Sequence, residues 1–98
     1  MSKAYLIGHI TITNPEGYAA YAAQVPNTLA AFGGKYLVRG GHATKVEGET
    51  LGERHVVIEF ANRETAQAWY ASEAYQAIVQ HRTANATGSL VLVDGYAP

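Results

Sequence analysis

The stretch AYLIGHITITNPE, residues 4–16, decides the fold because it contains the junction of a strand with a helix. Ala4–Ile12 is rich in β-branched and aromatic residues, which is typical of a strand. Asn14 is suited to cap a helix, Pro15 to occupy its first turn, and Glu16 to face its positive end. The stretch therefore predicts a strand that passes directly into a helix.

The rest of the chain continues this alternation of strand and helix patterns. The first helix should run to about Phe32, with a bend at Pro26. Two strands should follow, one from Lys35 to about Val46 with a bulge or twist at Gly40-Gly41, and one at Arg54–Phe60. A second helix, capped at Asn62 and restarted at Ser72, should run to about Asn85 and lead to a last strand, Ser89–Asp94. The order βαββαβ predicts an α+β, ferredoxin-like fold, with a four-stranded antiparallel sheet and two helices on one face. We expect residues 1–98 to form a single domain of this kind.

Both faces of the predicted sheet carry apolar side chains, whereas a face exposed to solvent should alternate with polar residues. Two helices cannot cover both sides of one sheet, so we expect the second face to pack on the same face of another copy. The sequence thus predicts a homodimer. One face is assigned Tyr5, Ile7, Val57, Val91 and Val93, and the other Leu6, Ile10, Ile58, Phe60 and Leu92.

The composition excludes several classes of function. Apolar residues make up 48% of the chain and charged residues 15%, which indicates a folded protein. A net charge of -1 without a basic run argues against nucleic acid and anionic membranes as partners. The chain contains no cysteine, no membrane-span pattern and no signal-peptide pattern, so we expect a cytoplasmic protein.

Several segments, taken in order, carry a family resemblance: AYLIGHITITNPEGYAAYA, FGGKYLVRGG, VEG, VVIEF, AWYASEAY and LVLVDG. Together they resemble the uncharacterised bacterial family called domain of unknown function 1330 across essentially the whole chain. The resemblance implies a ferredoxin-like fold of the dimeric α+β barrel type and no established reaction. The chain departs from the family pattern at Phe32, at Ala61-Asn62 and at Glu73, none of which touches an obvious chemical group.

The most informative charged residues are Arg39 and Glu59. A hairpin loop centred near Glu49 and Thr50 would place them roughly opposite each other on one sheet face. Two charges in apolar strands are costly unless they are paired, so we expect an ion pair that is structural, holds a ligand or registers the dimer.

Other candidate binding residues are aromatic or basic. Trp69 and Tyr75 fit a helix layer over the core, and Arg82 fits the end of the last helical stretch, where a cation suits the negative terminus. The pairing of the first and third strands should bring His9 and His55 together. We expect no metal site, because the spacing places no third ligand beside these histidines, and the sequence points to no cofactor.

Two functions remain open. The first is a non-catalytic homodimer that binds a small apolar metabolite, favoured by the lack of an assembled acid, base and nucleophile. The alternative is a cofactor-free small-molecule enzyme, a monooxygenase or isomerase, which rests on analogy with other dimeric barrels. A cavity of some hundreds of Å³ beside the sheet would favour binding or catalysis over a purely structural role.

Overall fold

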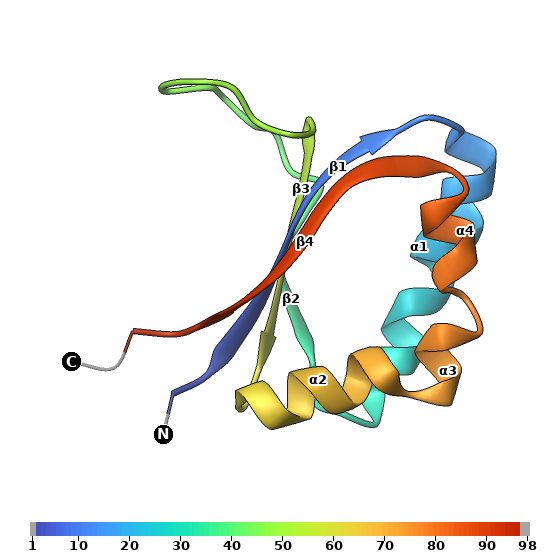
Figure 1. Ribbon diagram of the computed structural model, residues 1–98, viewed down its shortest axis with the longest axis vertical. Helices are drawn as coiled ribbons and strands as arrows, with labels where there is room; N and C mark the ends of the chain where they lie inside the picture. Colours follow the sequence, from blue (N-terminus) through green and yellow to red (C-terminus); the bar gives the residue numbers. More distant parts are fainter. Residues whose placement is uncertain (1, 97–98) are drawn as a thin grey trace.

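The computed structural model describes residues 2–96 and has the predicted α+β, ferredoxin-like architecture. Four strands form one antiparallel sheet in the order β2-β3-β1-β4, and all helices lie on one side of it (Figure 1). The elements are β1 (Ala4–Ile12), α1 (Pro15–Ala30), β2 (Lys35–Arg39), β3 (Arg54–Phe60), α2 (Arg63–Ala71), α3 (Glu73–Gln76), α4 (Val79–Thr83) and β4 (Ala86–Asp94).

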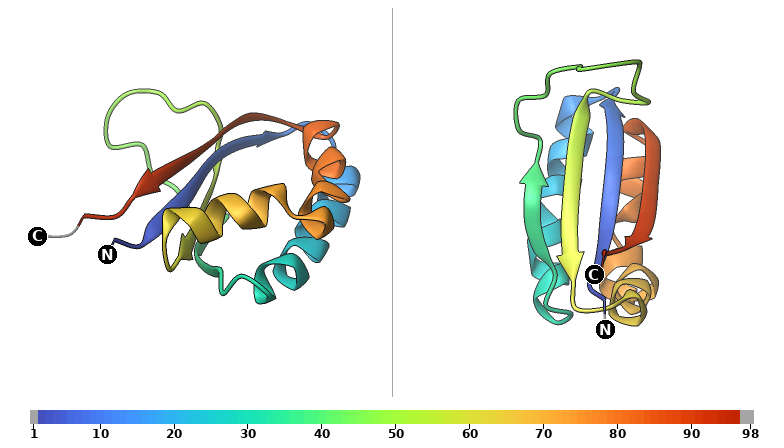
Figure 2. Two further views of the ribbon diagram at one scale, coloured as in Figure 1. Left: turned by 60° about the horizontal axis from the view of Figure 1, so that its bottom comes forward. Right: turned by 90° about the vertical axis from the view of Figure 1, so that its left-hand side faces the viewer.

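The sheet register confirms the predicted assignment of side chains to two faces. β1 lies in the centre and pairs Leu6 with Ile58 on β3 and with Leu92 on β4. Side chains in register point to the same face, so these three lie together beneath the helices. The right-hand view of Figure 2 shows the other face from the front, with no helix covering the strands.

Two of the predicted helix caps form as expected. The Asn62 side chain accepts a hydrogen bond from the Thr65 backbone N–H at 2.8 Å, and Ser72 accepts one from the Tyr75 N–H at 3.2 Å. Asn14 occupies the cap position of α1, but its side chain donates to Asn85 Oδ1 at 3.0 Å instead of capping the helix. The second helical region is therefore divided at Ser72, as predicted.

The second strand is shorter than predicted and carries its bulge elsewhere. β2 ends at Arg39, not near Val46, because Gly40 takes a left-handed φ of 69° that stops the ladder. The register shift lies between Tyr36 and Val38 rather than at Gly40-Gly41. Residues 40–53 then form a loop that projects toward the side of the sheet without helices (Figure 1).

The core lies between the helices and the covered sheet face. Its largest fully buried side chains are Trp69, Tyr75, Phe60, Ile10 and Val25. They come from β1, β3, α1, α2 and α3, so the core holds these helices against the sheet. Burial of such aromatic and aliphatic groups stabilises the folded chain by about 1.5–3 kcal/mol each.

The opposite face of the sheet, which we call the open face, has no helix over it (Figures 1 and 2). Large apolar side chains are exposed there: Val38 is 39% exposed, Val91 49% and Val93 41%. Solvent contact of a contiguous apolar surface is unfavourable, so this face is the fold's most obvious surface for association. Separately, none of the helices in residues 2–96 is both long and apolar enough to cross a membrane.

Candidate functional site

A cavity of about 630 Å³ opens between the helices and the sheet. Its floor is formed by leucines of β1 and β4, and its walls come from α2 and α4. The size is within the range that small-molecule sites use. The lining residues are Leu6, Ala66, Gln67, Tyr70, Arg82, Leu90 and Leu92.

The sequence of α2 explains why space remains here. Ala66 is 3% exposed and faces the sheet, where its single methyl group leaves room above Leu6 and Leu92. One turn further on, Tyr70 is 44% exposed and flanks the cavity, with its ring 5.4 Å from that of Tyr75. The small residue opens the cavity and the aromatic residue borders it.

Arg82 supplies the charge in the cavity wall. Its guanidinium lies 6.0 Å from the centre of the Tyr21 ring, and its Nε is buried without a hydrogen-bond partner. No salt bridge within residues 2–96 involves it. Burial works to lower the pKa of this guanidinium, but the neighbouring Tyr75 and Tyr21 oxygens outweigh burial and raise it. The cavity therefore carries a permanent positive charge that no carboxylate within residues 2–96 pairs.

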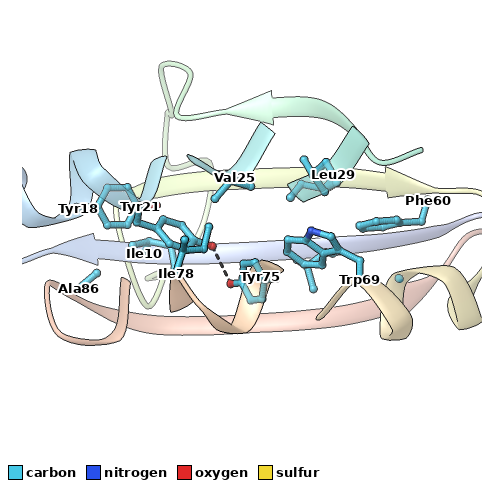
Figure 3. Close-up of a cluster of buried hydrophobic side chains, with 13 residues drawn as sticks. Ile10, Tyr18, Tyr21, Val25, Leu29, Phe60, Trp69, Tyr75, Ile78 and Ala86 are labelled. Atoms are coloured by element: carbon cyan, nitrogen blue, oxygen red, sulfur yellow. Dashed lines mark hydrogen bonds between the residues drawn. The ribbon is translucent and has the colours of Figure 1, made fainter. Parts of the chain in front are cut away.

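A buried polar cluster lies beside Arg82. The Tyr21 and Tyr75 hydroxyl oxygens are 2.8 Å apart and share a hydrogen bond, drawn as a dashed line in Figure 3. The Trp69 ring lies 4.2 Å from that of Tyr75, and its Nε1–H donates to Thr28 Oγ1 at 3.0 Å. Burial, reinforced by Tyr75, raises the pKa of the Tyr21 hydroxyl far above its ordinary range. Tyr21 is thus a neutral hydrogen-bonding group at physiological pH.

The lining of the cavity is suited to binding more than to proton transfer. Within the described part of the chain, its lining set holds no carboxylic acid, histidine or hydroxyl nucleophile, and Tyr70 is its one phenol. General acid–base catalysis needs a group whose pKa lies near the working pH. This arrangement provides a bound molecule with apolar contacts and one fixed positive charge.

The predicted ion pair between Arg39 and Glu59 is wrong. Glu59 stands opposite Lys35 on β2, and on the open face it accepts from Lys3 Nζ at 3.3 Å. Arg39 stands opposite Val56, on the helix side, and donates to the Ala22 carbonyl at 2.8 Å. The bulge adds one residue to β2 and thereby turns Arg39 to the other face.

The two histidines meet as predicted. His9 pairs with His55 in the β1–β3 ladder, and their Nδ1 atoms lie 2.9 Å apart. One nitrogen must donate and the other accept, so the contact is a hydrogen bond on the open face. Across residues 2–96, no group of three or more potential metal ligands gathers around them or elsewhere.

Of the predicted binding residues, Arg82 lines the cavity, while Trp69 and Tyr75 are buried behind it. Arg39, Glu59 and His9 lie elsewhere. The sequence prediction missed the other lining residues, which are Leu6, Ala66, Gln67, Tyr70, Leu90 and Leu92. The alternation in β4 identified Leu92 as inward-facing, but no sequence signal showed that Ala66 would leave it partly uncovered.

Comparison with known proteins gives a family match and several structural likenesses. The family described as Domain of unknown function (DUF1330) matches residues 3–96. No curated protein matches the chain. A protein of unknown function from Rhodopseudomonas palustris shares the fold at a TM-score of 0.81 and 16% identity, covering 99% of this chain and 85% of that one.

Two likenesses carry the names of enzymes. SnoaB, a cofactor-independent oxygenase from Streptomyces nogalater, has a TM-score of 0.68 and 10% identity, covering 100% of this chain and 97% of that one. A putative antibiotic biosynthesis monooxygenase from Caulobacter crescentus has a TM-score of 0.58 and 14% identity, covering 99% and 91%. At such low identity these likenesses establish the fold alone.

Proposed function

This chain belongs to the family described as Domain of unknown function (DUF1330), and from that premise we propose that it is a homodimeric protein that binds a small, mainly apolar molecule between helices and sheet. The observation that carries the proposal is the cavity of about 630 Å³ with its leucine floor. Apolar walls with a few polar groups are typical of small-molecule sites. Tyr70 is the one side chain in the described lining that could act as an acid, a base or a nucleophile, and this sparse set favours binding without catalysis.

The open face supports association of two copies. Val38, Val91 and Val93 are all between 39% and 49% exposed in a single protomer. Packing the open faces of two copies against each other would cover these side chains at once, and the same patch would serve on both subunits. The ligand cavity lies on the helix side of the sheet, so it stays separate from this surface.

Native mass spectrometry of freshly purified protein tests the binding proposal without assuming a ligand. The expected result is an adduct of defined mass on the dimer that is lost on denaturation. Ala66→Leu should narrow the cavity above Leu6 and Leu92 and reduce the adduct, while Ala71→Leu, at an exposed position on the same helix, should keep it. An adduct that is undiminished by Ala66→Leu in a folded dimer would place the ligand elsewhere.

A second candidate is a cofactor-free oxygenase acting on a molecule bound in the same cavity. The specific observation in its favour is the likeness to SnoaB, which covers this chain from end to end. An oxygen electrode decides between the two candidates once a ligand is recovered. Oxygen consumption that requires both ligand and protein would support the enzyme, and its absence would leave the binding protein.

A further inference from the structure

We propose that the molecule bound in this cavity is an organic acid, with an apolar body on the leucine floor and an anionic group paired with Arg82. This inference rests on the proposed function and adds the chemical class of the ligand. Three observations on the site carry it: Arg82 has no carboxylate partner within residues 2–96, it lies next to the apolar floor, and a hydrogen-bonded pair of tyrosines lies beside it.

Arg82 has no carboxylate partner in the part of the chain that the structure describes. The carboxylates that form salt bridges within residues 2–96 are Glu59, Glu49 and Asp94, and each pairs with another cation. The Arg82 Nε is buried and has no hydrogen-bond partner. Water screens a partly buried charge less than an exposed one, so a ligand anion at this point would gain more than the same anion at an exposed arginine.

The position of Arg82 defines where the anionic group would lie. Arg82 lines both the large cavity and a small adjoining void of about 20 Å³ that Tyr18 and Tyr21 also line. Leu6 and Leu90 line both spaces as well, so the guanidinium is next to the apolar floor. A flat acid can place its apolar part on the leucines and its carboxylate against the guanidinium, which matches carboxylate geometry with paired donors.

The hydroxyls next to Arg82 favour the same ligand class. Tyr21 and Tyr75 share one hydrogen bond, so one of the two hydroxyl hydrogens remains free to donate. Because burial raises the pKa of the Tyr21 hydroxyl, Tyr21 supplies no negative charge that would pair with Arg82 at neutral pH. Arg82 itself lines the cavity, and Tyr21 lines the small void beside it, so these neighbours add no negative charge of Tyr21 to compete with a bound oxygen anion.

Arg54 provides a matched control within the same protein. Its Nε is also buried without a partner, and its guanidinium lies 5.4 Å from the Tyr18 ring. It lines the small void but not the large cavity. Arg54→Gln and Arg82→Gln thus remove the same charge and similar packing, but only the second changes the cavity wall.

The test compares 2-naphthoate with its neutral isostere 2-naphthamide, titrated into the dimer at pH 7 and followed by NMR. We expect the methyl signals of Leu6, Leu90 and Leu92 to shift with both probes, and 2-naphthoate to bind about 10-fold more tightly. Arg82→Gln should reduce this preference to less than about twofold without weakening binding of the amide. Arg82→Lys should retain part of the preference, and Arg54→Gln all of it.

The outcomes separate this inference from the proposed function. Equal affinities for the two probes in the unmodified protein, or a preference that survives Arg82→Gln, would overturn the inference and leave small-molecule binding intact. Absence of leucine shifts with either probe would overturn both. If Arg82→Gln fails to fold, the Arg82 Nε–H signal of the unmodified protein decides, because only the acid should shift it.

Discussion

Replacing Tyr75 with phenylalanine removes half of the buried hydroxyl pair and tests its contribution to stability. Tyr75 is fully buried and Tyr21 is 8% exposed, so water cannot readily replace the lost partner. A hydrogen bond contributes about 1 kcal/mol, and leaving a buried group unsatisfied costs about 1–3 kcal/mol. We therefore expect Tyr75→Phe and Tyr21→Phe each to lower the free energy of unfolding by about 1–3 kcal/mol.

The double replacement should cost less than the two single replacements added together. With both hydroxyls absent, no buried group is left without a partner, so a coupling free energy of about 1–2 kcal/mol is expected. Urea unfolding at one fixed protein concentration, followed by the fluorescence of the single tryptophan, measures all four proteins. Tyr96→Phe, at a position 91% exposed, is the control and should change nothing.

A coupling below about 0.5 kcal/mol would refute the reasoning, since it would mean that the two hydroxyls do not depend on each other in solution. An unchanged slope of unfolding free energy against urea in all four proteins is needed for this comparison, because a changed slope would indicate a different unfolded or folded state.

Three further predictions follow from the described contacts. The folded chain keeps the Tyr21 proton, whereas the unfolded chain loses it near pH 10. The free energy of unfolding should therefore be unaffected by Tyr21 below pH 9 and should fall above pH 10. Tyr21→Phe should reduce that fall by about 1.4 kcal/mol per pH unit in urea melts. Val91→Asp on the open face should shift the protein to protomers of 10.5 kDa in sedimentation at micromolar concentration, and an intact dimer would remove this face from the interface. Gly40→Ala should cost about 1–2 kcal/mol, because φ is 69° and the new Cβ would collide with the Arg54 guanidinium; Gly41→Ala, with nothing within 4 Å, should be nearly neutral in the same melts.

The parts of the fold that follow from local pattern were predictable. β1 and β3 have clear strand composition and alternate without interruption, so both their faces and the meeting of His9 with His55 could be read from spacing. The helix starts at Asn62 and Ser72 were equally clear, because capping depends on the residues immediately around it. Such features depend on residues close together in the chain or on simple alternation.

The candidate site depended on features that local pattern does not determine. The bulge between Tyr36 and Val38 has no glycine or proline to mark it, yet it decides which way Arg39 faces. The position of Arg82 depends on the angle at which the short helix α4 returns to the sheet, and the cavity depends on Ala66 standing above Leu92. Both features depend on how segments that are far apart in the sequence pack in space, and the spacing of residues along the chain does not determine that packing.

The central position of β1 has a consequence for the timing of folding during synthesis. β1 leaves the ribosome before β4, yet β4 is one of its two neighbours in the sheet, with Tyr5 opposite Val93. Chains grow at about 5–20 residues per second, so β1 must wait several seconds for that partner. Until then the longest ladder of the sheet cannot form, and an apolar strand has one edge unpaired. We therefore expect nascent chains that end before Ala86 to bind chaperones.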